Sequence, residues 1–226
     1  MRMLVVFQKG EALRHIGHLD LMRAMQRILR RTGLPVAYSQ GFNPHMVMNF
    51  AAPLSVGAAG KREIMDVGLL DEVGEKEFLD RLGACLPPGL RALEARLVPD
   101  GYPAPMSRLF AASYELSVDG AAEESLPGLL PGFLNQAEIP AMRKTKSGEK
   151  LCDLRPMIYD LSANTGESGI VLSATLALRE QATLKPDLLM ETLCAFGGIP
   201  CPAFSLMRTA LWGQRPQGEL IPLESL

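Results

Sequence analysis

Short apolar runs alternate with amphipathic stretches through the first hundred residues, and this pattern predicts strands separated by helices. Residues 3–7 are continuously apolar, which is typical of a buried strand. From residue 18 to residue 31 the apolar side chains recur at helical spacing and form one face of a predicted helix. These side chains are Leu21, Met22, Met25, Ile28 and Leu29. Gly33 ends this helix, and Pro35 begins an extended segment over residues 36–39.

The same pattern continues to a proline-rich segment. We expect strands over residues 46–52, 63–70 and 90–98, and a helix over residues 75–85 that stops at Pro87. Residues 99–106 contain three prolines and a glycine, which favours a linker.

Beyond the linker the order of elements repeats. Strands are predicted over residues 114–118, 170–178 and 203–211, and helices over residues 123–136 and 186–196. Pro127 suits the first turn of its helix, whereas Pro131 is expected to break or kink it. Residues 139–144 and 150–160 are predicted to form a hairpin around residues 146–149.

Each half therefore has the order strand, helix, strand, strand, helix, strand. Helices separated by antiparallel strands favour the α+β class over a parallel α/β sheet. We predict two ferredoxin-like (βαββαβ) halves packed together, each an antiparallel sheet with helices on one face. The expected domains are residues 1–100 and 110–213, followed by a tail over residues 214–226.

Composition limits the classes of protein that fit. The chain has 226 residues, of which 47% are hydrophobic and 21% charged, an ordinary globular composition. A formal net charge of -2 means that any nucleic-acid surface must be local. No apolar run reaches the length of a membrane span, and the first residues lack the long apolar stretch of a signal peptide. The four cysteines form no C-x-x-C pair, so we expect free thiols in a reducing cytoplasm.

Polar residues able to do chemistry gather between residues 13 and 53. All three histidines lie there, and His18 and Asp20 come at a predicted helix start. One interpretation is local: His18 caps the helix and Asp20 pairs with Arg23. A second is that His18 and His45 converge on a pocket, which makes His18, His45 and Asp20 the catalytic candidates. Their spacing matches no standard metal-ligand pattern, so neither a metal nor another cofactor is predicted.

The Gly/Pro loop at residues 40–45 has two interpretations as well. Glycine and Asn-Pro form turns readily, so the segment can simply join strands. However, Phe42 and His45 are planar groups that stack on bases, and Gln40 and Asn43 carry both donors and acceptors. Single-stranded RNA is recognised by such groups.

Two basic stretches stand out from the near-neutral background. The first helix carries a row of arginines opposite its apolar face, Arg23, Arg27, Arg30 and Arg31. The second stretch contains Arg143, Lys144, Lys146, Lys150 and Arg155. Such rows are commonly solvated helix or hairpin faces, but two local patches on this chain also fit phosphate contacts.

The motif residues resemble a known family. The segments RHIGHLDLMR at residues 14–23 and GLPVAYSQGFNPH at residues 33–45 resemble the radical-SAM-linked protein family. This is a domain of unknown function found alone or at the C-terminus of cobalamin-binding radical SAM proteins. RKTKSG at residues 143–148 and DLRP at residues 153–156 are also similar to it. The sequence departs from the family at residues 46–48, where Met-Val-Met replaces a proline and a basic residue. The resemblance implies an association with radical SAM chemistry and with RNA or ribosome maturation.

Three hypotheses for function follow. The first is a non-catalytic RNA-binding or substrate-presenting accessory protein that works with a radical SAM partner. The second is an enzyme acting on RNA with His18 and His45 as an acid–base pair. The third is a docking module that binds only a protein partner. The chain lacks the cluster-binding cysteine triplet of a radical SAM enzyme, so it is not the radical enzyme itself.

Overall fold

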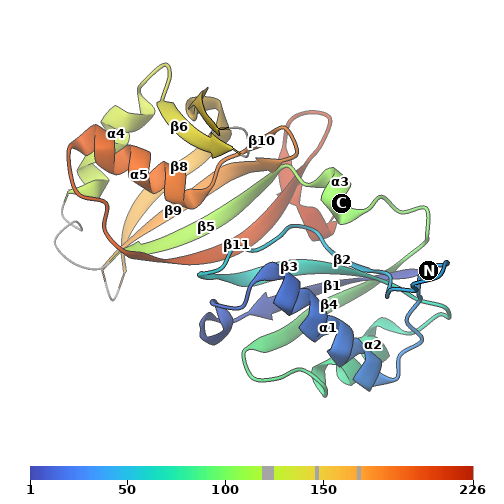
Figure 1. The fold of residues 1–226 in the computed structure, drawn as a ribbon. Coiled ribbons are helices and arrows are strands. Elements are labelled where there is room, and N and C mark those ends of the chain that lie inside the picture. Colours follow the sequence, from blue (N-terminus) through green and yellow to red (C-terminus); the bar gives the residue numbers. More distant parts are fainter. Residues whose placement is uncertain (119–124, 146–147, 167–168, 226) are drawn as a thin grey trace. The chain divides into compact units, whose positions relative to one another are not determined.

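The structure is a computed structural model that describes residues 1–118, 125–145, 148–166 and 169–225. The chain divides into two compact units. The first comprises Met1–Leu109 together with Ala210–Leu226, and the second comprises Phe110–Thr209. Helices alternate with mostly antiparallel strands, which confirms the predicted mixture of helices and antiparallel sheet (Figure 1).

The strands of the first unit pair around its first strand. β1 (Arg2–Lys9) lies between β3 (Ala58–Gly68) and β4 (Leu90–Val98), and both pairings are antiparallel. The short β2 (Met48–Phe50) pairs with the other edge of β3. Segments far apart in sequence are thus neighbours, and the spatial order is β4, β1, β3, β2.

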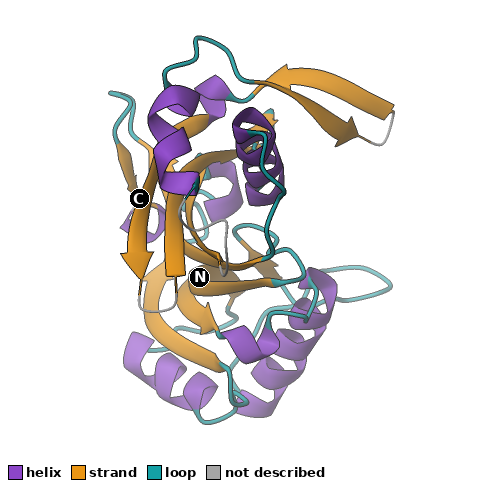
Figure 2. Cartoon of the chain, turned by 90° about the vertical axis from the view of Figure 1, so that its left-hand side faces the viewer, coloured by secondary structure: helices purple, strands orange, loops and turns teal. Residues whose placement is uncertain are grey.

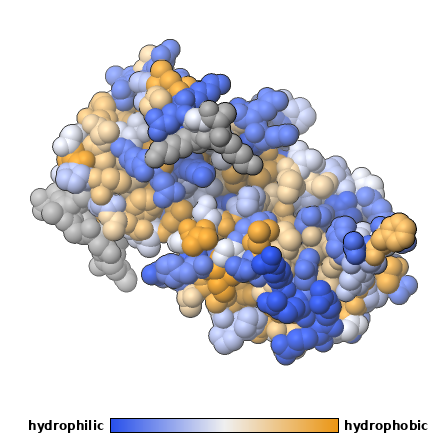
Figure 3. All heavy atoms as spheres, in the orientation of Figure 1, coloured by the Kyte–Doolittle hydropathy of each residue, from blue (hydrophilic) through white to orange (hydrophobic). Residues whose placement is uncertain are grey.

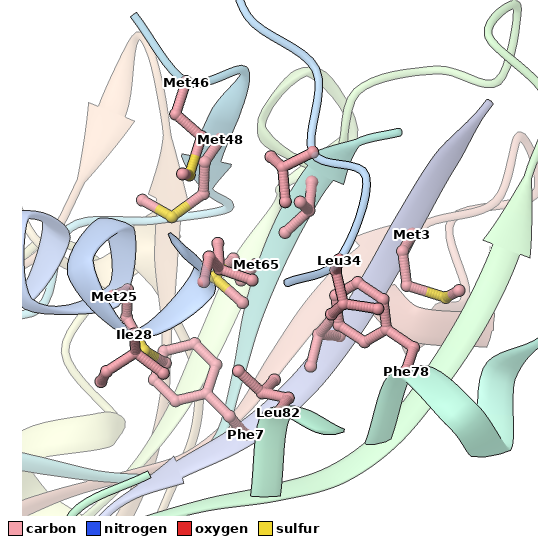
Figure 4. Close-up of a cluster of buried hydrophobic side chains, with 14 of the residues drawn as sticks. Met3, Phe7, Met25, Ile28, Leu34, Met46, Met48, Met65, Phe78 and Leu82 are labelled. Atoms are coloured by element: carbon pink, nitrogen blue, oxygen red, sulfur yellow. The ribbon is translucent and has the colours of Figure 1, made fainter. Parts of the chain in front are cut away.

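Two helices cover one face of these strands. They are α1 (His18–Thr32) and α2 (Glu75–Gly83). Alternate residues of β1 point into the core between strands and helices, because successive side chains of a strand face opposite sides. Met3, Phe7, Met25 and Phe78 are fully buried there (Figure 4). The apolar residues that recur at strand spacing in β1 and at helical spacing in α1 and α2 therefore pack into one core.

The end of α1 shows why the helix stops where the sequence predicts. Gly33 adopts φ 65°, a left-handed conformation that favours glycine. The guanidinium of Arg81 in α2 donates two hydrogen bonds, of 3.1 and 2.8 Å, to the carbonyl oxygen of Thr32. A cation on these last carbonyls also favours the helix dipole.

Some predicted boundaries of the first unit differ from the structure. The expected strand over residues 36–39 forms only two isolated bridges, Val36 with Leu69 and Tyr38 with Met46. β3 begins at Ala58, five residues before its predicted start. Its pairing with β1 extends back to Gly60, which lies opposite Lys9. The predicted linker ends in a short helix, α3 (Pro105–Arg108).

In the second unit β9 (Gly169–Arg179) pairs with β5 (Ala111–Val118), with β8 (Ile158–Gly166) and with the two-residue β10 (Ala182–Thr183). The helices are α4 (Leu126–Leu134) and α5 (Pro186–Gly197). They pack together, and the rings of Phe133 and Phe196 meet edge to face at 5.6 Å. Pro127 lies in the first turn of α4 as predicted, whereas α4 continues through Pro131.

A separate hairpin belongs to the second unit. β6 (Pro140–Thr145) and β7 (Gly148–Asp153) form a sheet of two strands, the ribbon at the upper right of Figure 2. The predicted strand over residues 150–160 is interrupted by the 3-10 helix η2 (Arg155–Met157). Pro156 explains this interruption, because it supplies no backbone N–H for strand pairing.

The C-terminal residues are ordered into elements. β11 (Phe204–Gln214) pairs with β12 (Leu220–Pro222), and η3 (Leu223–Ser225) follows. Glu224 accepts a 2.9 Å hydrogen bond from Arg62 on β3, so residues predicted to be a tail are joined to the first unit. In the part of the chain that the structure describes, no helix is long and apolar enough to cross a membrane.

Candidate functional site

The motif at residues 14–23 contains the start of α1. Gly17 occupies the N-cap position in an extended conformation, without a side-chain hydrogen bond to the helix. His18 is the first residue of α1, and its ring meets the ring of Phe50 edge to face at 5.6 Å. The helix therefore begins at a glycine, and the interpretation of His18 as its side-chain cap is wrong.

Asp20 and Arg23 form the local pair that their spacing predicts. The Asp20 carboxylate accepts a 3.1 Å hydrogen bond from the Arg23 guanidinium. Both side chains are about two-thirds exposed, at 69% and 65%. Solvent screens such a pair, so its contribution to stability is about 1 kcal/mol at most. The contact orients Arg23 rather than stabilising the fold.

A buried lysine holds the loop that precedes α1. Lys9 at the end of β1 is completely buried. Its ammonium donates hydrogen bonds to the carbonyl oxygens of Arg14 (3.4 Å), Ile16 (2.9 Å) and Ala58 (3.1 Å). A buried charge requires several such partners. Lys9 thus joins the backbone of the motif at residues 14–16 to the first residue of β3.

Sequence reasoning missed Lys9. A lysine beside a glycine is ordinarily expected at the surface, so this local pattern gives no sign that Lys9 is buried. The available signal was its position, two residues after Phe7 in the alternation of Met3, Val5 and Phe7, and shortly before the motif. That signal shows proximity to the motif but not burial.

Residues 39–45, at the end of the motif at residues 33–45, form a closed and exposed loop. Ser39 and His45 join its two ends: Ser39 N donates to His45 O (2.8 Å), and His45 N donates to Ser39 Oγ (3.0 Å). The Ser39 hydroxyl also lies 2.8 Å from Nδ1 of His45. Gly41 has φ 123°, which few other residues adopt. Gln40, Asn43 and His45 are exposed, and the ring of Phe42 is fully exposed.

The two histidines have different contacts in the structure. Phe50 pairs with Met65 of β3, and Val47 bonds to the position three residues further along that strand. Residues 47 and 50 are therefore about 10 Å apart. His45 precedes Val47 by two residues and bonds to Ser39, whereas the ring of His18 packs against Phe50.

The arginine row lies on the outer face of α1. Arg23, Arg27, Arg30 and Arg31 are exposed, opposite the buried face of Leu21, Met25, Ile28 and Leu29. Hydrophilic residues gather over α1 in the space-filling view (Figure 3). Arg30 and Arg31 also occupy the last turn, where cations favour the helix dipole. The row is thus available to a ligand and has a local role at the same time.

The second basic stretch has mixed roles. Arg143 is half-buried on β6, and Lys144 pairs through its backbone with Glu149. Lys146 lies outside the described residues. The guanidinium of Arg155 donates to the carbonyl oxygens of Leu134 (3.1 Å) and Ile158 (3.5 Å). Arg155 therefore anchors the end of the hairpin to the rest of its unit. The sequence shows that this residue is basic but not that its guanidinium binds backbone carbonyls.

Metal ligation has no candidate among residues 1–118, 125–145, 148–166 and 169–225. No group of three or more histidine, cysteine, aspartate or glutamate side chains there is arranged to hold a metal ion. The exposed loop and the cations instead offer hydrogen-bond donors, positive charge and an aromatic face.

These features describe a mixed α/β protein whose motif residues lie at the surface of one unit and at the base of a hairpin in the other. A family model matches residues 2–186, a range that includes both motifs and the hairpin. The chain belongs to that family, described as an uncharacterized protein conserved in bacteria (DUF2344). No curated protein matches the sequence.

Proposed function

We propose that this protein is a non-catalytic accessory protein that binds RNA, or presents an RNA substrate, to a radical SAM enzyme. The observation that carries the proposal is the fully exposed ring of Phe42 on a loop closed by Ser39 and His45. Exposed aromatic rings that are held in place offer faces on which unpaired bases stack. The neighbouring Gln40 and Asn43 supply amide donors and acceptors for base edges.

The arginine row supports a phosphate-binding role beside that loop. Arg27 and Arg30 are exposed on the same helix face as Arg23, and α1 is the helix that the first motif begins. Guanidinium groups bind phosphate oxygens in a bidentate manner. The charges are concentrated on one helix of a chain with net charge -2, so the attraction to a polyanion is local.

A non-catalytic role is supported by the different contacts of the two histidines. Acid–base catalysis requires both groups within hydrogen-bond reach of one substrate. The packing of His18 on Phe50 and the bond of His45 to Ser39 favour roles other than acid–base catalysis for both rings. An RNA-processing activity that is lost in both His18→Ala and His45→Ala would replace this proposal with the enzymatic one.

The proposal has three further parts. The partner is a radical SAM protein, supported by the resemblance of the motifs at residues 14–23 and 33–45. The location is the cytoplasm, supported by four free cysteines. The two units are ferredoxin-like halves, supported in the first unit by the strand order β4, β1, β3, β2 with helices between β1 and β2 and between β3 and β4. An experimental structure tests the last part directly.

The decisive experiment measures binding of a labelled single-stranded RNA at several salt concentrations. The test variant changes Arg23, Arg27 and Arg30 to alanine. The matched control changes three exposed cations of the same unit, on α2, on β4 and just after β11, namely Lys76, Arg91 and Arg215. For each phosphate that the variant no longer binds, the slope of log affinity against log salt should fall by about 0.7 for single-stranded RNA. The control should keep the native slope.

Two results would overturn the proposal. One is native protein that shows no salt-dependent affinity for any RNA tested. The other is equal weakening in the test and control variants, which would mean that net charge alone drives binding. Binding to a radical SAM partner without affinity for RNA would favour the protein-docking hypothesis.

A further inference from the structure

Two cations face each other across the β6–β7 hairpin. In the register of the two strands Arg143 is opposite Lys150, and Met142 is opposite Leu151. Because side chains alternate between the two faces of a ribbon, Arg143 and Lys150 share one face with Ala141 and Cys152. That face carries no acidic residue between positions 141–145 and 148–152, since Glu149 occupies the other face.

Like charges directly opposite on paired strands destabilise the pair. Within the described part of the chain, neither Arg143 nor Lys150 has an ion-pair partner. β6 and β7 also form a sheet of only two strands, an arrangement that is marginal without outside support. The repulsive pair therefore lies in a sheet that is already marginal, which favours a functional use for the two charges.

The base of the hairpin is held firmly enough to keep the pair in position. The Asp153 carboxylate accepts hydrogen bonds from the backbone of Ile139 (2.7 Å) and of Arg155 (2.9 Å). Arg155 in turn donates to Leu134 O, and Ile139 O accepts from Leu154 N at 2.8 Å. The cation pair begins two residues beyond the buried Ala141. It is thus at the junction between an anchored base and an exposed ribbon.

We propose that Arg143 and Lys150 bind one phosphate group of the RNA backbone between them. The Arg143 guanidinium donates to phosphate oxygens in a planar fork, and the Lys150 ammonium acts as a compact charge on the opposite strand. A bound phosphate replaces the repulsion of the pair with two attractions. This inference rests on the proposed function. It adds that the second unit binds the RNA backbone through Arg143 and Lys150.

The test uses the full chain and the substitution Lys150→Glu. It converts a repulsive cross-strand pair into an attractive one, so the melting temperature of the free protein should rise by about 1–3 °C. The affinity for labelled single-stranded RNA should fall about tenfold at low salt. Arg91→Glu on β4 changes net charge equally and is the control. The exchange Arg143→Lys with Lys150→Arg keeps both cations and should retain binding.

Inorganic phosphate provides a second arm that does not depend on RNA. Phosphate should raise the melting temperature of the native protein relative to chloride of equal ionic strength, and Lys150→Glu should abolish that rise. If phosphate stabilises through this pair but no RNA binds, the pair binds free phosphate and the proposed function fails. If RNA binds but Lys150→Glu weakens it no more than Arg91→Glu does, the inference fails and the function stands. A protein that responds to neither ligand overturns both.

Discussion

The ammonium of Lys9 lies 2.9 Å from the carbonyl oxygen of Ile16, and this contact joins the end of β1 to the residues that begin α1. The same ammonium bonds to Ala58 O at the start of β3. A fully buried charge thus donates to backbone carbonyls of the loop before α1 and of the first residue of β3. The motif at residues 14–23 has its shape because one lysine binds its carbonyls from inside the unit.

Lys9→Met should therefore destabilise the first unit although the two side chains have similar length. It leaves the buried carbonyl groups without a donor, and we expect a loss of about 2–4 kcal/mol in the free energy of unfolding. Chemical denaturation measures this loss. Gln8→Met, at the half-buried neighbouring position, is the control and should change stability by about 0.5 kcal/mol or less. Equal effects of the two substitutions would show that Lys9 has no special role.

Phe42→Ala should separate binding from folding. The ring is fully exposed, so its removal should change stability by about 0.5 kcal/mol or less. If a base stacks on it, affinity for single-stranded RNA should fall by about 1–3 kcal/mol. Leu70→Ala removes another exposed apolar side chain of the same unit, 70% accessible, and should leave affinity unchanged. Native affinity in Phe42→Ala would show that the loop does not contact RNA.

His45→Ala tests the loop in a different way. The substitution removes the bond between Nδ1 and the Ser39 hydroxyl but keeps the backbone bonds that close the loop. We expect native-like thermal unfolding and a loss of about 1–3 kcal/mol in ligand binding. His18→Ala should lose stability as well, because the His18 ring packs on Phe50. Unfolding of His45→Ala comparable to a core truncation would show that the loop is structural.

Periodicity predicted most elements because it reports which face of an element is buried. α1 ends just before Gly33, β4 has its predicted bounds and α5 begins at Pro186, each with a local signal in the sequence. Contacts between residues that belong to different elements have no comparable local signal in the sequence. The burial of Lys9 depends on carbonyls of residues 14, 16 and 58, and the place of Arg155 depends on Leu134.

The interpretation in which His18 and His45 converge on a pocket rests on the order of elements and on the glycines near both residues. That order gives the neighbours of β2 but not how far along β3 each residue pairs. In the structure Phe50 is a residue that contacts the start of α1, through the ring of His18. A shift of one residue in the pairing of two strands turns every side chain to the other face of the sheet. Two motif residues that each lie near the end of an element therefore need not be neighbours in space.

Arg155→Ala should loosen the hairpin rather than remove a phosphate contact. Its guanidinium holds Leu134 O and Ile158 O, and these acceptors lose their donor in the variant. We expect a loss of about 1–3 kcal/mol in stability. Amide exchange should accelerate in β6 and β7 with or without RNA. Arg179→Ala, an exposed arginine of the same unit, is the control. Unchanged exchange in Arg155→Ala, together with weaker RNA binding, would assign Arg155 to the ligand instead.

Cys194 should make the second unit sensitive to alkaline pH. Burial, together with the neighbouring thiol of Cys201, raises the pKa of Cys194 to about 11. An unfolded cysteine has a pKa near 8.5, so the folded state retains the proton more tightly. The stabilisation is complete below about pH 8.5 and is lost as pH rises toward 11, because deprotonation then favours the unfolded chain. Thermal unfolding should show a fall in melting temperature across this range.

The variant Cys194→Ala isolates that contribution. It should be less stable at neutral pH, since a buried side chain is truncated, but its further loss between about pH 8.5 and 11 should be smaller than that of the native protein. Cys85→Ala in the first unit controls for general alkaline effects. Iodoacetamide should modify the exposed Cys201 well before Cys194 in the folded protein, because a buried thiol with a raised pKa carries little thiolate. Parallel pH profiles for the native protein and Cys194→Ala would show that the thiol does not contribute.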